Sequence, residues 1–307
     1  MLLNLIENLL RSGLKLAAPL WLTATGETFS ERSGVINIGL EGMMLVGAFA
    51  GMVLAYYTAN PWLGVLAGIA AGALLAALFG MLTVYFAADQ IIVGAGINLL
   101  AAGLTGFLFR HIFGVTGAAL TVASFTPIKI PGLAELPLLG RVLFEQPALL
   151  YLAFAVIPLS AFVLKRTHLG LAIRACGEYS AAADTAGLNV FRLRFGCVLF
   201  CGMMCGAAGA YLSLAHANTF VEGLTAGRGF IALALVIFGR WQPWGIFFAA
   251  LFFGCANALQ FQFQALGSGI PYQIFLMLPY VLTLLVLIFA RGGASAPAEL
   301  GKVYRRE

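Results

Sequence analysis

The sequence predicts an all-α integral membrane protein with about nine transmembrane helices, in a range of 8–10. Composition gives the first reason. Of the 307 residues, 62% are hydrophobic and only 9% are charged, whereas a soluble domain carries about 25% charged residues. The second reason is that long stretches lack Asp, Glu, Lys and Arg, and a membrane helix needs about 20 apolar residues. These stretches are Gly42–Ala88, Gln90–Phe109, Gln146–Leu164, Phe195–Val221 and Trp241–Ala290.

The expected helices follow in order from these stretches. A somewhat more polar segment before the first stretch predicts the first helix. The first and last stretches are long enough for two helices each, and each contains a break, at Thr58–Pro61 and at Gly267–Pro271. The predicted helices are residues 14–30, 39–58, 62–87, 91–112, 147–165, 193–215, 227–239, 243–264 and 272–290. The seventh is short for a full span, which suggests a tilted, broken or partly re-entrant helix.

Basic residues indicate the orientation, because short loops rich in Lys and Arg stay in the cytoplasm. Lys165, Arg166, Arg174, Arg192 and Arg194 lie between helices five and six, and four further basic residues lie after residue 290. Nine spans put both segments on one side. We therefore expect one transmembrane domain over 1–291, with a cytoplasmic segment at 166–191, and a cytoplasmic tail at 292–307.

One feature disagrees with this orientation. Nine spans place the N-terminus, with Arg11 and Lys15, on the outer side. An N-terminal segment along the membrane surface, or a re-entrant first helix, would remove the conflict. The longest external loop, about Gly114 to Gln146, is either an ordered outer cap or a contact surface for an extracytoplasmic partner.

Motifs of enzymes and of metal or nucleic-acid binding are missing from the sequence. It contains no GxxxxGK[ST] loop for nucleotide phosphates and no HExxH metal pair, so we expect no catalytic residue. Cys197, Cys201 and Cys205 share a helix face and could bind a soft metal. Their neighbours include no His or carboxylate, which favours packing. The net charge of +5 is scattered among loops, which speaks against nucleic acid.

Polar residues in the apolar stretches are candidates for a solute pathway, because they are costly in a membrane and often functional. The strongest group is Glu31–Gly42, where three glycines and Asn37 predict broken or tightly packed backbone between helices one and two. Glu41 in this group either serves the pathway or stabilises a helix start. Asn98, Asn257 and Gln260 complete the set. These amides suit a neutral polar solute and, equally, helix–helix hydrogen bonds.

Glycines at a spacing of four predict close helix packing. Gly64, Gly68 and Gly72 share one helix face, as do Gly202 and Gly206. In lipid, small residues on one face let helix backbones approach closely. We interpret these glycines as packing positions and assign no site to them.

The cytoplasmic segment carries the most specific pattern. Residues 166–190 are rich in Ala, favour helix and are flanked by basic residues. Gly170 to Val190, with Ala182-Ala183 and Gly187-Leu188-Asn189-Val190, is similar to the ATPase-coupling segment of ABC importer permeases in the ribose and branched-chain amino-acid group. Ser33–Gly42 resembles the second signature of that group. Gln90–Gly94 and Gly229–Ala234 resemble its nucleoside and simple-sugar branch, in particular the shorter permease.

This resemblance implies a fold, a function and partners. It implies a coupling helix between helices five and six, with contacts to the ATPase from Arg174, Gly177, Glu178, Ala182, Ala183 and Gly187. The implied partners are a cytoplasmic ABC ATPase, a second homologous permease in a heterodimer, and an extracytoplasmic solute-binding lipoprotein. ATP and Mg would bind to the ATPase and no cofactor to this chain. The expected location is the bacterial inner membrane, within lipid, as a multi-pass protein.

The implied function is ATP-driven import of a small polar solute, a nucleoside in the first place, by alternating access. One alternative is a permease of the same kind for a simple sugar. The other is a secondary transporter that works alone. The latter would need an ion site or proton relay inside the membrane, and few carboxylates lie away from helix ends in this sequence.

Overall fold

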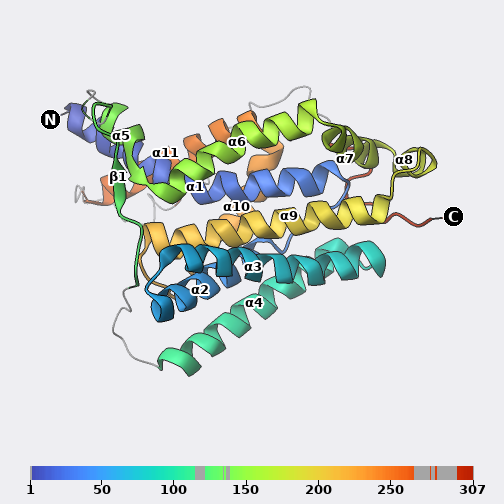
Figure 1. Ribbon diagram of the computed structural model, residues 1–307, viewed down its shortest axis with the longest axis horizontal. Helices are drawn as coiled ribbons and strands as arrows, with labels where there is room; N and C mark the ends of the chain where they lie inside the picture. The colour runs from blue at the N-terminus through green and yellow to red at the C-terminus, as the bar shows by residue number, and fades with distance from the viewer. Residues whose placement is uncertain are drawn as a thin grey trace.

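The computed structural model describes residues 2–114, 122–133, 135, 139–265, 277, 281 and 296–306. Helices of this part pack side by side into an elongated bundle (Figure 1). The helices are α1 (Leu2–Arg32), α2 (Leu40–Thr58), α3 (Pro61–Gly80), α4 (Gln90–Phe113), α5 (Leu139–Phe144), α6 (Ala148–Arg166), α7 (His168–Glu178), α8 (Ser180–Thr185), α9 (Val190–Tyr211), α10 (Arg228–Phe238) and α11 (Pro243–Ala265). Two π-helical turns, η1 (Met81–Tyr85) and η2 (Leu212–His216), extend α3 and α9.

The prediction of a multi-pass helical membrane protein is confirmed. Six helices of the described part are long and apolar enough to cross a membrane, namely α2, α3 with η1, α4, α6, α9 with η2, and α11. The short seventh helix of the prediction is α10, an apolar helix of 11 residues. The predicted helix 272–290 lies, apart from Met277 and Val281, outside the described residues.

Two expectations need correction. The first helix was expected at 14–30, but α1 is 31 residues long and begins at Leu2. An all-α chain was expected, but the segment between α4 and α6 adds an antiparallel pair of short strands, β1 (Pro127–Lys129) and β2 (Glu145–Pro147). Alternation of hydrophobic residues could not reveal strands of three residues, because a strand pattern needs at least four.

Helix α1 lies in the centre of the bundle. Trp21 is fully buried and donates a hydrogen bond from Nε1 to the Ala153 carbonyl of α6 at 3.1 Å. Its ring also packs on Phe154 and Phe247, with centroid distances of 5.2 and 5.3 Å. A buried tryptophan needs such a partner for its N–H group. These contacts hold α6 and α11 against α1.

The glycine prediction is confirmed by the contact between α3 and α9. A Cβ atom built on Gly72 would lie 2.8 Å from Gly206 Cα, and one on Gly68 would lie 3.0 Å from the Gly206 carbonyl oxygen. One on Gly47 of α2 would lie 2.6 Å from Gly206 Cα. The three backbones therefore touch where side chains are missing, which is how helices associate in lipid.

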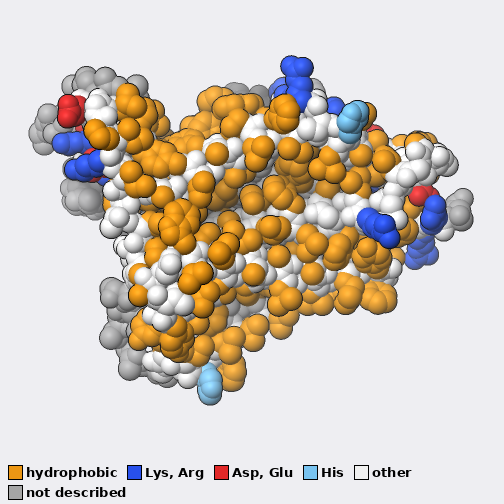
Figure 2. Space-filling model, in the orientation of Figure 1, with side chains coloured by type: hydrophobic (Ala, Val, Ile, Leu, Met, Phe, Trp, Pro, Cys, Tyr) orange, Lys and Arg blue, Asp and Glu red, His pale blue; other side chains and the backbone are white. Residues whose placement is uncertain are grey.

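Charged side chains gather toward the two ends of the visible face, with hydrophobic side chains between them (Figure 2). At the end that holds the N-terminus, Arg11 pairs with Glu145 at 3.5 Å and Glu7 pairs with Arg141 at 3.8 Å. The other end holds α7, α8 and the C-terminus (Figure 1). Ion pairs of both polarities thus join the N-terminal segment to residues 141–145. At about 1.5 Å per residue α1 is long enough to extend past the hydrocarbon core.

Candidate functional site

The chain between α1 and α2 turns back into the bundle. Gly34 has a φ of +100°, which favours glycine, and a Cβ there would lie 2.6 Å from Arg194 Nη2. After this turn the Asn37 N–H donates to Glu27 Oε1 at 2.8 Å. Glu27 lies five residues before the end of α1, about 7 Å into the bundle. The predicted break in the Glu31–Gly42 group is therefore present, and α2 begins inside the bundle.

Asn37 lies at the deepest point of this re-entrant segment, residues 33–39, and is completely buried. Its Oδ1 accepts the Gly39 N–H at 2.9 Å, and its Nδ2 faces Met43 Sδ at 3.3 Å and Cys201 Sγ at 3.6 Å. All of its partners belong to the chain itself. Asn37 therefore fixes the backbone of the segment and is not open to a solute in this conformation.

Glu41 lies in the first turn of α2, but its carboxylate binds the start of α10. Its carboxylate accepts the N–H groups of Gly227 and Gly229 at 2.8 and 2.7 Å and the Thr225 hydroxyl at 2.5 Å. The first N–H groups of a helix have no partner within that helix, and a carboxylate is stabilised there. The sequence left two roles open for Glu41, in the solute pathway or at the start of its own helix α2. The structure shows that Glu41 caps α10, so two helices begin together inside the bundle.

Asn98 of α4 completes this junction and is half-buried. Its Oδ1 accepts the Gly42 N–H at 2.8 Å, and its Nδ2 donates to the Ile38 carbonyl at 2.9 Å. The structure thus brings together Asn37, Glu41 and Asn98 of the predicted set. Each binds backbone, so the helix–helix alternative describes their contacts here.

Asn257 and Gln260 lie apart from this junction. They belong to α11, which packs on the N-terminal half of α1, because a Cβ on Gly254 would touch Ala17 Cβ at 2.7 Å. Gln260 is buried and Asn257 half-buried. The sequence gives only their helical positions, so it could not separate them from the residues around α2.

The predicted cytoplasmic segment forms two short helices, α7 and α8, joined at Tyr179. Of the predicted contact residues, Glu178, Ala182 and Gly187 are exposed, whereas Arg174 is half-buried and Gly177 and Ala183 are buried. Gly187 has a φ of +89° and ends α8, a conformation that favours glycine. A Cβ on Gly177 would collide with the Arg32 carbonyl, so Gly177 allows α7 to touch the end of α1.

Three exposed apolar side chains of this segment were missed. Tyr179 is 62% exposed, Leu171 58% and Leu169 54%. Small exposed residues follow Tyr179 along the chain, which are Ala181, Ala182, Thr185, Ala186 and Gly187. Aromatic side chains commonly anchor protein–protein interfaces. Tyr179 was available as a signal, because it interrupts the alanine-rich pattern after Glu178.

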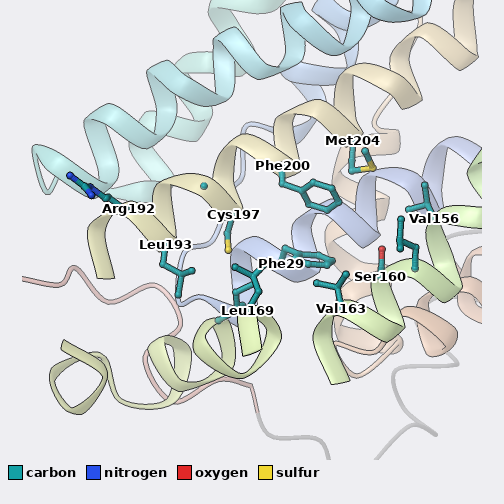
Figure 3. A pocket seen from close by; sticks show the side chains of 13 residues that line it. Phe29, Val156, Ser160, Val163, Leu169, Arg192, Leu193, Cys197, Phe200 and Met204 are labelled. Atoms are coloured by element: carbon teal, nitrogen blue, oxygen red, sulfur yellow. The ribbon is translucent and has the colours of Figure 1, made fainter. Parts of the chain in front are cut away.

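A groove of about 530 Å³ lies between α1, α6, α7 and α9 (Figure 3). Its walls are almost entirely apolar and include Phe29, Val163 and Phe200, with Ser160 as a polar exception. The Arg192 side chain extends away from the other labelled side chains (Figure 3). Because a polar solute would find few hydrogen-bond partners here, the groove is not the solute site.

The cysteine face of α9 packs against Glu27. Cys201 Sγ donates to Glu27 Oε2 at 3.2 Å and lies 4.0 Å from Cys205 Sγ. Within the described residues, no three His, Cys, Asp and Glu side chains gather in a way that could hold a metal ion. The Cys201 sulfur therefore acts here as a hydrogen-bonding and packing group.

Helices that begin inside a membrane bundle are the arrangement that transporters use around their pathways. Fold and site together thus define a multi-pass membrane transport protein. Residues 9–289 match the family described as the branched-chain amino acid transport system permease component. The chain belongs to this permease family and is a transport subunit of the membrane.

Curated relatives match over nearly the whole chain. A guanosine ABC transporter permease of Bacillus subtilis is 42% identical over 299 residues, covering 94% of this chain and 93% of the relative. A nucleoside ABC transporter permease of Lactococcus lactis is 37% identical and covers 98% of both. A protein of Haloferax volcanii provisionally named a glucose ABC transporter permease is 37% identical and covers 99% of both. No solved structure matches the chain.

Each of these organisms also has a second, more distant match that is named as a permease of the same solute. The identities are 26% in Bacillus subtilis, 24% in Lactococcus lactis and 27% in Haloferax volcanii.

Proposed function

We propose that this chain is the shorter permease of an ATP-driven ABC importer and that it translocates a nucleoside by alternating access. The observation that carries the proposal is the guanosine permease match at 42% identity over 94% of the chain, supported by the nucleoside permease at 37%. The glucose-named relative at 37% makes a simple sugar the second candidate.

The proposed topology has nine spans in one transmembrane domain over 1–291, with α10 as a short span and the ninth at 272–290. The segment 166–191 and the tail 292–307 would lie in the cytoplasm of a bacterial cell, and the N-terminus outside. The placement of α7, α8 and residues 296–306 at one end supports this. At the opposite end, Arg11 of the N-terminal segment pairs with Glu145, and the positive-inside rule still counts Arg11 as a basic residue outside.

The α7–α8 segment is the proposed docking site for the ATPase, which would bind ATP and Mg on its own chain. Tyr179 and Leu171 would enter its cleft, beside the small residues Ala182 and Gly187. Arg174 and Glu178 would form the charged rim, while Gly177 and Ala183 hold the segment against the bundle. The exposed apolar side chains support this role, because an exposed apolar patch at a water-facing end marks an interaction surface.

We propose a heterodimer with a second permease and a solute-binding lipoprotein outside. The heterodimer is supported by the pair of permeases, one similar and one distant, in each of three organisms. The pathway would run beside the starts of α2 and α10. Asn98, together with Asn257 and Gln260 nearer the outer end, would face the solute when these short helices move, and Asn37 and Glu41 would hold them in place.

The test reconstitutes both permeases, the ATPase and the binding protein in liposomes. Uptake of radiolabelled guanosine should require ATP on the side of the liposome membrane that carries the ATPase. A large excess of glucose should not reduce this uptake. If glucose competes for uptake and nucleosides do not, the substrate is a sugar and not a nucleoside. Uptake by this chain alone, without nucleotide, would indicate a secondary transporter and would contradict the proposal.

A further inference from the structure

The C-terminal residues 296–306 are folded onto the bundle. They run beside α7, α8 and the start of α9 at the same end of the molecule (Figure 1). The Glu299 N–H donates to the Gly177 carbonyl at 2.9 Å, and Tyr304 packs on the buried cluster of Cys176, Ala183 and Val190. Arg306 pairs with Asp184 of α8 at 2.9 Å. One side of this strap, residues 296–306, is thus bound to the α7–α8 segment.

The other side of the strap is bound to the re-entrant segment 33–39. The Gly301 N–H donates to the Gly34 carbonyl at 3.0 Å. A Cβ on Gly301 would lie 3.3 Å from the end of the Ile36 side chain. The strap therefore bridges two parts of the chain that lie about 140 residues apart in sequence. In the proposed function, the α7–α8 segment binds the ATPase and the re-entrant segment leads to the solute pathway.

Arg194, at the start of α9, joins all three parts. Only 3% of its side chain is exposed. Its Nε donates to the Ser33 carbonyl at 3.0 Å, its Nη1 to the Lys302 carbonyl at 2.9 Å, and its Nη2 to the Ser180 hydroxyl at 2.7 Å. Glu299 provides the counter-charge at 3.4 Å and also binds the Ser180 hydroxyl. A guanidinium has five N–H donors in a fixed plane, so one side chain holds two backbone carbonyls and the Ser180 hydroxyl in a defined geometry.

We propose that the strap and Arg194 transmit movement of the α7–α8 segment to the re-entrant segment, with Arg194 and Glu299 as positioning residues for transport. The inference rests on the proposed function. Displacement of α8 would act through Ser180, Arg194 and Glu299 on Ser33 and Gly34. The segment that follows contains Asn37 and ends at Glu41, which caps α10. Movement at the ATPase would thereby reach both helices that begin inside the bundle.

The test uses the complete reconstituted transporter with four changes in this chain. These are deletion of 296–307, Glu299→Gln, Arg194→Lys, and Arg305→Gln as the control. Arg305 lies in the same strap and is exposed, and within the described part of the chain it forms none of the ion pairs that hold the strap. Three quantities are measured: ATPase retained on purification, ATP hydrolysed, and solute taken up per ATP.

We expect the deletion and Glu299→Gln to retain the ATPase and to hydrolyse ATP within about twofold of the unchanged transporter, while uptake per ATP falls at least about tenfold. Arg194→Lys should fall between, because lysine keeps the charge and loses the planar set of donors, and Arg305→Gln should transport normally. Unchanged uptake per ATP in the deletion and in Glu299→Gln would overturn the inference. Loss of uptake in proportion to loss of bound ATPase would also overturn it, because the strap would then only support docking.

Accessibility of Cys176 confirms that each variant tests the strap. This thiol is completely buried beneath the cluster that includes Tyr304, so a water-soluble maleimide should label it only when the strap is displaced. If the deletion variant does not accumulate in the membrane, Glu299→Gln alone tests the inference. Unchanged uptake per ATP, or loss of uptake in proportion to loss of bound ATPase, would again overturn it. Failure of the unchanged transporter to move any nucleoside or sugar would refute the proposed function and is distinguishable from both results.

Discussion

The cap that Glu41 places on α10 can be tested by removing its carboxylate. Glu41→Ala leaves the N–H groups of Gly227 and Gly229 and the Thr225 hydroxyl without their acceptor. The two N–H groups lie in the first turn of α10 and have no partner within that helix. The change should destabilise the start of α10 and, with it, the junction to α2.

The magnitude follows from the number of bonds. A hydrogen bond to a charged group contributes about 1.5–3 kcal/mol, and an unsatisfied buried donor costs about 1–3 kcal/mol. Two N–H groups and one hydroxyl are involved, but Glu41 is half-buried and such contributions are not additive. We expect Glu41→Ala to lower the free energy of unfolding by about 3 kcal/mol, and Glu41→Gln, which keeps one acceptor oxygen, by about half of that.

The assay is thermal unfolding of the purified chain in lipid nanodiscs. Glu222→Ala is the matched control, because this substitution also removes a carboxylate. Glu222 pairs with Arg110 at an exposed site, where both side chains are about half exposed. An exposed ion pair contributes about 0–1 kcal/mol, so the control should unfold close to the unchanged protein. Equal melting temperatures for Glu41→Ala and Glu222→Ala would refute the cap.

Further predictions concern packing, turn geometry and one thiol. Gly72→Ala should destabilise the chain by about 2 kcal/mol or more, because the added methyl group overpacks the contact between α3 and α9. Gly96→Ala in α4, where a Cβ meets nothing within 4 Å, should not destabilise it, and thermal unfolding of the isolated chain in nanodiscs compares the two variants. Gly187→Val should cost about 1–2 kcal/mol at a φ of +89° and abolish uptake while the chain stays in the membrane, as immunoblots with uptake assays would show. Burial raises the pKa of the Cys176 thiol; the Arg194 charge opposes this effect, while Glu299 and Asp184 add to it. Because the net direction is upward, Cys176 should be less ionised at pH about 8.5 than a free thiol, and its maleimide labelling there should be at least about tenfold slower than in the unfolded chain.

Much of the fold follows from the sequence because lipid imposes a simple condition. A spanning segment must be apolar and must satisfy its own backbone, so charge-free length predicts helices well. Helices α2, α4 and α6 begin and end within two residues of the prediction. Helix α1 did not follow this rule, because charged residues such as Glu27 and Glu31 lie along it and are buried against protein.

The site could be predicted in part only. A glycine-rich break with Asn37 and Glu41 is visible in the sequence, and it does mark the junction inside the bundle. The partner of Glu41 is not visible, because Gly227 and Gly229 are almost 190 residues away and nothing in the pattern around them points to a carboxylate. The same holds for Arg194, which reads as an ordinary basic residue at a cytoplasmic helix start.

Burial distinguishes Arg194 from the other basic residues of that segment. Removing a guanidinium from water is expensive unless its donors are satisfied, and lysine or a shorter polar residue could not reach Ser33, Lys302 and Ser180 together. A loop that served only to mark the cytoplasmic side would need positive charge but no buried arginine. The cost of burying this charge is therefore offset only while α8, the strap and the re-entrant segment keep their relative positions, because each of them supplies a partner of the guanidinium.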